Sequence, residues 1–121
     1  MIKAYYVMRK DLKMSEAKLG VQIGHGTDMI HMRTTCKRTY QKWIQHFERR
    51  KIVTQIKTEQ RLLNLAKMLK EKNIEYFEIW DNGLTEFEGK TLTGIVITPA
   101  EEKYLPKKVK SLQLWKDRKV V

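Results

Sequence analysis

The chain has 121 residues, so we expect a single compact domain over residues 1–121. Lys and Arg number 25 against 14 Asp and Glu, and the formal charge of +11 favours a polyanionic partner that carries phosphate. Anionic lipid, or solubility alone, would also account for this charge. No apolar run reaches the ~18 residues of a membrane span, and the single cysteine, Cys36, excludes an internal disulfide and fits a reducing cytoplasm.

The first predicted elements are a buried strand and a long helix. Ile2 to Met8 is almost continuously apolar, which indicates a strand that is buried on both faces. Ser15 can cap a helix that runs from about Glu16 to about Thr35. We expect Cys36 to belong to this helix as a small packing residue. Small side chains along the same helix predict its close approach to a sheet, and these are Ala17, Gly20, Gly24 and Thr27.

A second amphipathic helix is predicted over about Thr39 to Arg49, because apolar residues such as Trp43 and Phe47 recur at helical spacing. The later elements are a strand over Ile52 to Ile56, a helix capped by Thr58 and closed by Asn73, strands over Ile74 to Trp80 and Leu92 to Thr98, a short helix over Ala100 to Val109, and an extended piece over Leu112 to Trp115. We expect Pro99 to stop the last of these strands. The basic tail over residues 116–121 is expected to fray.

The order of these elements predicts an α/β fold. Strands that alternate with helices favour three layers, α/β/α, with helices on both faces of the sheet. The connection between the last two strands carries no predicted helix, which permits a mixed sheet rather than an all-parallel one. Sites in such sheets gather where strands end and helices begin. This rule points to the loop after the first strand and to the loop that begins at Asp81.

Lys18, Gln22 and His25 share one face of the first helix, because their spacing is i, i+4 and i+7. Two interpretations explain this row of polar residues: a functional site, or an ordinary solvent-exposed face of the helix. His25 can also simply bond a neighbouring loop, and Asp81 can simply cap a turn at the end of its strand. The sequence shows no nucleophile triad, no zinc-ligand spacing and no glycine-rich phosphate loop. A lysine, a carboxylate and a bound water are therefore the tools available to an enzyme of this sequence.

Three blocks of the sequence resemble the type 2 peptidyl-tRNA hydrolases, in the order and spacing of that family. The first is MRKDLKM at residues 8–14, followed by Lys18 and by QIGH at residues 22–25. The second is DNGLTEF at residues 81–87, and the third is GKTLTGIVITPA at residues 89–100. The resemblance runs along nearly the whole chain.

The resemblance implies a mixed four-stranded sheet, a homodimer, and hydrolysis in the cytoplasm of the ester between a peptide and tRNA, without a metal or organic cofactor. Asp81 would orient or deprotonate the attacking water, and Lys18 would stabilise the oxyanion. Carried over by position, the catalytic candidates are Lys18, Gln22, His25, Asp81 and Thr85. The basic residues expected to hold the acceptor stem and 3′ end of peptidyl-tRNA are Arg9, Lys13, Arg38, Lys42, Arg49, Arg50, Lys107 and Lys108.

The second block departs from the family pattern. Asn82 replaces a small alanine and Glu86 replaces an amide, and Glu86 would raise the pKa of one carboxyl group if it lay close to Asp81. We interpret the chain as a divergent member, and a viral source is compatible with that divergence. The departures leave two other functions open. One is a tRNA-binding or protein-interaction module without turnover, and the other is an esterase for another acylated nucleotide.

Overall fold

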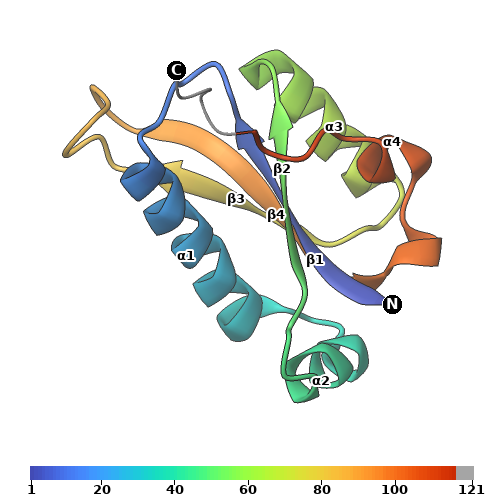
Figure 1. Cartoon of the computed structure of the whole chain (residues 1–121). Coiled ribbons are helices and arrows are strands. Elements are labelled where there is room, and N and C mark those ends of the chain that lie inside the picture. Colours follow the sequence, from blue (N-terminus) through green and yellow to red (C-terminus); the bar gives the residue numbers. More distant parts are fainter. Residues whose placement is uncertain (117–121) are drawn as a thin grey trace.

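The computed structural model describes residues 1–116, and its strands and helices are arranged around one sheet (Figure 1). The elements in chain order are β1 (Ile2–Arg9), α1 (Glu16–Arg33), α2 (Lys37–Gln45), β2 (Lys51–Ile56), α3 (Glu59–Glu71), β3 (Tyr76–Asp81), β4 (Thr91–Glu101), the 3-10 helix η1 (Glu102–Tyr104) and α4 (Lys107–Lys110). The sheet has four strands in the order β2-β1-β4-β3. β1 is parallel to β2, whereas β4 is antiparallel to both β1 and β3. The predicted α/β fold with a mixed four-stranded sheet is therefore confirmed.

Helices cover both faces of the sheet, as the alternation of side chains along β1 requires. The cluster on one face joins β1 to α3 and α4 through Tyr5, Val7, Leu62, Leu65, Leu69 and Val109. The cluster on the other face joins β1 to α1 and α2 through Tyr6, Met8, Ile30 and Trp43. Figure 1 shows these two pairs of helices on opposite sides of the strands. The expected three layers are thus present, and β1 is buried on both faces.

Two predicted element boundaries are wrong. β4 does not stop at Pro99, because the pairing of β1 with β4 shifts register between Lys3 and Tyr5. Such a bulge leaves Pro99 outside the paired positions, so its missing N–H costs no ladder hydrogen bond. α2 ends at Gln45 instead of near Arg49, which takes a left-handed backbone with φ 42°. Phe47 therefore lies outside the helix and is 89% exposed.

The segments before α2 and after β4 also differ from expectation. Cys36 is exposed and precedes α2, so it is not the packing residue that the sequence predicted. The helix predicted over residues 100–109 is instead the end of β4, η1 and α4. Leu114 forms an antiparallel bridge with Thr54, so the predicted extended piece covers the outer edge of β2. The prediction that the tail over residues 116–121 frays is not tested, because residues 117–121 lie outside the described residues.

One line of side chains on α1 faces the sheet and determines which residues reach the site. Gln22, Gly26 and Ile30 are the buried residues of α1, at spacing i, i+4 and i+8. A Cβ atom on Gly26 would lie 3.0 Å from Cδ1 of Ile79 and 3.1 Å from Cε2 of Tyr6. The close approach of helix and sheet therefore occurs at Gly26, and it directs Gln22 toward the strands.

The predicted stripe of small residues on α1 holds for Thr27, whose hydroxyl lies 2.6 Å from that of Tyr6 on β1, but is wrong for its two glycines. Apart from the chain neighbours and the backbone of α1 itself, no atom lies within 4 Å of the position that a Cβ would take on Gly20 or Gly24, and both residues are exposed. These two glycines face solvent because the line through Gln22 and Gly26 occupies the sheet side of the helix. No helix among residues 1–116 is long and apolar enough to cross a membrane.

Candidate active site

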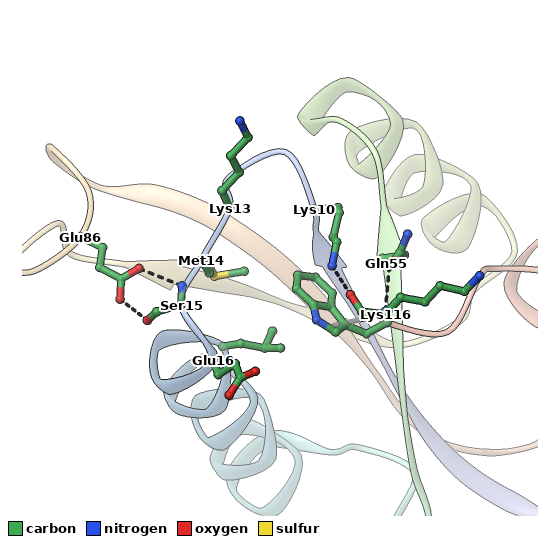
Figure 2. A pocket seen from close by; sticks show the side chains of 10 residues that line it. Lys10, Lys13, Met14, Ser15, Glu16, Gln55, Glu86 and Lys116 are labelled. Atoms are coloured by element: carbon green, nitrogen blue, oxygen red, sulfur yellow. Dashed lines mark hydrogen bonds between the residues drawn. The ribbon is translucent and has the colours of Figure 1, made fainter. Parts of the chain in front are cut away.

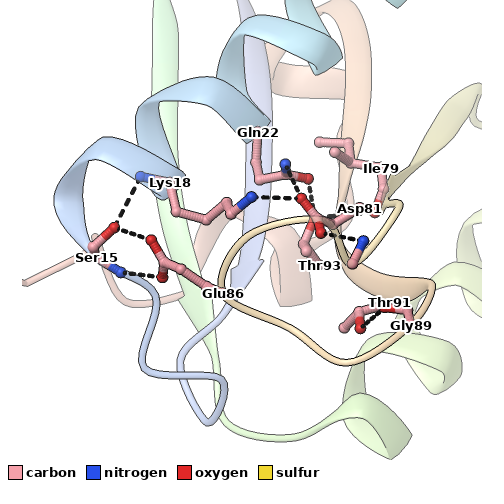
Figure 3. A network of polar contacts seen from close by, with 10 residues as sticks. Ser15, Lys18, Gln22, Ile79, Asp81, Glu86, Gly89, Thr91 and Thr93 are labelled. Carbon is pink, nitrogen blue, oxygen red and sulfur yellow. Dashed lines mark hydrogen bonds and ion pairs between the residues drawn. The ribbon is translucent and has the colours of Figure 1, made fainter.

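The ends of β1 and β3 and the start of α1 meet at one edge of the sheet. Both strands run antiparallel to β4, so Arg9 and Asp81, their last residues, lie toward the same edge. α1 begins after Ser15, whose hydroxyl accepts a hydrogen bond from the backbone N–H of Lys18 at 3.1 Å. This helix start directs the side chain of Lys18 toward the end of β3 (Figure 3).

An ion pair between Lys18 and Asp81 forms the centre of this site. Nζ of Lys18 lies 2.8 Å from Oδ2 of Asp81, and the two side chains are 10% and 8% exposed. Because water screens them little, each charge depends strongly on the other. The hydrogen bond from Lys18 is the main reason that the pKa of Asp81 lies below its ordinary value. The carboxylate therefore stays ionised at neutral pH.

Gln22 and Thr93 hold the carboxylate of Asp81 from the sheet side. Nε2 of Gln22 donates to Oδ2 of Asp81 at 3.1 Å, and Oε1 of Gln22 lies 2.8 Å from the Thr93 hydroxyl. The reverse orientation of the amide would turn an oxygen toward the carboxylate, which is unfavourable. Both Gln22 and Thr93 are fully buried, so their arrangement is rigid.

Thr93 is a site residue that the sequence analysis missed. Its hydroxyl also lies 3.0 Å from the carbonyl oxygen of Ile79, so it bridges α1 and β3. The available signal was a hydroxyl within a strand whose neighbours, from Leu92 to Val96, are otherwise apolar or glycine. Such a group must find a partner when it is buried.

The carboxylate of Asp81 retains capacity for one more hydrogen bond. Oδ2 accepts from Lys18 and Gln22, and Oδ1 accepts from the backbone N–H of Gly83 at 2.7 Å. A carboxylate offers about four lone-pair positions, so Oδ1 can accept from a water molecule as well. Among residues 1–116, Asp81 alone accepts from the ammonium group of Lys18, which leaves further N–H donors for a substrate oxygen.

Glu86 binds the start of α1. Its carboxylate accepts a hydrogen bond from the Ser15 N–H at 3.1 Å and another from the Ser15 hydroxyl. The hydroxyl of Ser15 is the main reason that the pKa of Glu86 lies below its ordinary value, and Asp81 has the smallest influence. Asp81 thus acts to raise the pKa of Glu86, as expected of a nearby carboxylate, but the hydrogen bonds from Ser15 outweigh this effect. Each carboxylate has its own donors, and these outweigh the repulsion between the two.

The structure brings together Lys18, Gln22 and Asp81 but leaves the other two catalytic candidates exposed. His25 follows Gln22 by one turn, and its charge contributes to the lowered pKa of Asp81. Thr85 lies in the connection between β3 and β4, and its side chain forms no hydrogen bond within residues 1–116. In the same part of the chain, no group of at least three His, Cys, Asp or Glu side chains could hold a metal ion.

The basic residues predicted to bind tRNA do not share one face. Arg9 is 7% exposed, and its guanidinium donates to Asp11, Glu59 and the carbonyl oxygen of Leu92, which favours a structural role. Lys13 is exposed on the loop before α1. The others are Arg38 and Lys42 on α2, Arg49 and Arg50 before β2, and Lys107 and Lys108 on α4. Since α2 and α4 lie on opposite faces of the sheet, one RNA helix cannot contact all of them from one side.

Comparison with known proteins gives a consistent match over nearly the whole chain. A family model described as peptidyl-tRNA hydrolase PTH2 matches residues 2–115. The peptidyl-tRNA hydrolase of Thermococcus onnurineus (strain NA1) is 32% identical over 114 residues, which are 93% of this chain and 96% of the relative. That of Methanopyrus kandleri is 30% identical over 115 residues, 94% of this chain and 98% of the relative. That of Staphylothermus marinus is 31% identical over 115 residues, 93% of each.

Proposed function

The chain belongs to the peptidyl-tRNA hydrolase PTH2 family and hydrolyses peptidyl-tRNA, and we propose that Lys18 and Asp81 form the centre at which it does so. The observation that carries this proposal is their ion pair at 2.8 Å, with both side chains largely withdrawn from water. Perturbed and desolvated charges of this kind are typical of catalytic sites. Gln22 and Thr93 keep the carboxylate in place.

Asp81 orients the attacking water through the acceptor position that remains on Oδ1. Its lowered pKa makes Asp81 a weak base, so its part is to align the water and to stabilise the positive charge that develops as the water attacks. The water oxygen bonds to the ester carbonyl carbon, and the bond from that carbon to the ribose oxygen then breaks. The proton that the water loses ends on the ribose oxygen, so the products are a free peptide and free tRNA.

Lys18 stabilises the oxyanion of the tetrahedral intermediate with N–H donors that Asp81 does not use. It lies in the first turn of α1, where the positive end of the helix dipole adds to the stabilisation. His25 and Thr85, which are exposed around the pair, position the ester and the terminal adenosine.

Exposed basic residues hold the acceptor stem and the 3′ end of the tRNA. Lys13 lies on the loop that leads into α1, and Arg38 and Lys42 lie on α2, beyond the other end of α1. Each phosphate contact removed by mutation should make the plot of log binding constant against log salt concentration less steep by about 0.9. This is the value for duplex DNA, applied here to the duplex acceptor stem.

We propose further that the chain acts in the cytoplasm as a homodimer. Val21 and Met32 on α1 are 51% and 76% exposed, and such apolar side chains suit a contact between copies. The single cysteine fits a reducing compartment. Size-exclusion chromatography with light scattering tests the dimer, and a monomeric mass at micromolar concentration would contradict it.

The experiment that tests the function compares two substrates. Purified protein is incubated with N-acetylaminoacyl-tRNA and, separately, with free aminoacyl-tRNA, and release of the acyl group is followed over time. We expect the N-blocked substrate to be hydrolysed well above its spontaneous rate and faster than the free one. Tight binding of tRNA without release would contradict hydrolysis and favour a binding module instead.

A further inference from the structure

A cleft of about 1020 Å³ opens beside the start of α1 (Figure 2). α1 packs over β3 and β4, whereas the cleft lies toward β1 and β2, between the loop after β1 and the segment that contains Trp115 and Lys116. Its volume is at the upper end of the roughly 300–1,000 Å³ of small-molecule sites. The space therefore suits a length of polymer better than one small metabolite.

Three lysines lie around this cleft. Lys10 and Lys13 belong to one turn, in which the N–H of Lys13 donates to the carbonyl oxygen of Lys10 at 3.3 Å and Lys13 has φ 53°. Lys116 approaches from the opposite wall, and the ammonium group of Lys10 donates to its carbonyl oxygen. Figure 2 shows Lys10 directed across the cleft and Lys13 directed outward at the rim. Of the two acidic residues in the lining, Glu86 is already bound by Ser15.

The cleft also contains an aromatic ring that the backbone holds in place. The backbone N–H of Trp115 donates to the carbonyl oxygen of Val53 at 2.9 Å, and the backbone N–H of Lys116 donates to Oε1 of Gln55 at 3.0 Å. These two bonds fix the segment against β2. The ammonium group of Lys10 lies 4.0 Å from the centroid of the Trp115 ring. A positive charge from one wall and an indole ring from the other thus meet inside the cleft.

We propose that this cleft binds the unpaired nucleotides at the 3′ end of the tRNA. A base packs against Trp115, and phosphates lie against Lys10, Lys13 and Lys116. Sites for single-stranded nucleic acid combine positive charge along the backbone with aromatic rings for the bases. The peptide half of the substrate carries no fixed negative charge, so it gives no reason for three lysines at one cleft.

This inference rests on the proposed function, because it connects the cleft to the Lys18–Asp81 pair. Ser15 lines the cleft, and its hydroxyl caps the turn that carries Lys18. An RNA end that lies in the cleft therefore ends close to the reacting ester.

The test uses a fluorescently labelled single-stranded RNA with the sequence ACCA, whose binding is measured by anisotropy at several salt concentrations. Trp115→Leu should weaken binding about tenfold or more, whereas Trp115→Phe should retain most of it, because a stacked base contributes about 1–3 kcal/mol. Lys13→Gln should reduce the salt slope by about 0.7. Lys70→Gln makes the same change of charge on α3, across the sheet, and should leave both values unchanged.

Hydrolysis of N-acetylaminoacyl-tRNA is measured with the same proteins, so that the two proposals can fail separately. A rise in KM that exceeds the fall in kcat for Trp115→Leu and Lys13→Gln supports the cleft as an RNA site. Equal binding of ACCA by wild type, Trp115→Leu and Lys13→Gln would overturn it, even if wild type hydrolyses its substrate. A dependence on peptide length that changes in these variants would also overturn it, because the cleft would then hold the peptide. Because Lys13 is exposed, Lys13→Gln should fold like wild type. It therefore tests the RNA site even if Trp115→Leu misfolds.

Discussion

Nζ of Lys18 lies 2.8 Å from Oδ2 of Asp81, although 63 positions separate the two residues in the chain. The contact exists because α1 begins at the edge of the sheet where β3 ends. Its energetic value depends on burial, since an exposed pair would contribute little. The account of catalysis follows from this pair and from the residues that hold it.

Removal of the Thr93 hydroxyl should disturb the pair without touching it. In Thr93→Val the Oε1 atom of Gln22 loses its partner, so we expect the free energy of unfolding to fall by about 1–3 kcal/mol. The Gln22 amide can then rotate away from Asp81, so kcat should fall by about tenfold with little change in KM. Steady-state kinetics and urea unfolding measure the two effects.

Thr93→Ser is the matched control for this position. It keeps the hydroxyl within reach of Gln22 and should recover most of the lost kcat. If Thr93→Val and Thr93→Ser are equally active, the hydroxyl has no positioning role and only the volume of the side chain matters.

The two glycines on α1 should respond oppositely to alanine. No atom outside the backbone of α1 and the chain neighbours of Gly24 lies within 4 Å of the position of a Cβ there, so Gly24→Ala should raise the free energy of unfolding by about 0.5–1 kcal/mol. Gly26→Ala should lower it by on the order of 1 kcal/mol, because the new methyl group meets Ile79 and Tyr6. Neither neighbour can move aside, since both are buried and the hydroxyl of Tyr6 is bonded to Thr27 at 2.6 Å. Equal free energies of unfolding for the two variants would contradict the close approach of α1 to the sheet at Gly26.

The ion pair also predicts how stability depends on pH. The pKa of Asp81 is lower in the folded protein than its ordinary value of 3.8, so its contribution to stability is present above that pH. The contribution disappears as the pH falls through the lowered pKa. We therefore expect wild type to exceed Asp81→Asn in stability at pH 7, by on the order of 1–3 kcal/mol. The difference should shrink below pH 3.8, which urea unfolding at several pH values measures. A difference that is the same at every pH would contradict the assignment.

Much of the fold was predictable from local sequence pattern. The predictions that failed concern element boundaries that tertiary contacts determine. The apolar run of β1 and the spacing of Leu62, Leu65 and Leu69 on α3 match the packing of the two faces directly. The ends of α2 and β4 did not follow from local pattern. Arg49 takes a left-handed backbone outside the predicted helix, and Pro99 is accommodated by a bulge whose position depends on the pairing with β1.

The site residues also divide into those that local sequence pattern predicts and those that depend on tertiary packing. The helical spacing of Lys18 and Gln22 placed both on one face, and the structure brings that face to Asp81. Thr93 could not be found from spacing, because its role depends on the pairing of β3 with β4 beneath α1. Charge alone did not reveal the main partner of Glu86, because Ser15 is 71 positions away and supplies an N–H and a hydroxyl.

A double-mutant cycle on Lys18 and Asp81 tests the central claim most directly. Single-turnover hydrolysis of N-acetylaminoacyl-tRNA is measured for Lys18→Ala, Asp81→Asn and the double variant, with Lys70→Ala on α3 as the control and circular dichroism as the check of folding. We predict that each single variant loses about 100-fold or more in rate. The double variant should lose little more than the worse single one, because the two residues act as a unit. Wild-type rates in both folded single variants, or losses that simply multiply in the double variant, would contradict the claim.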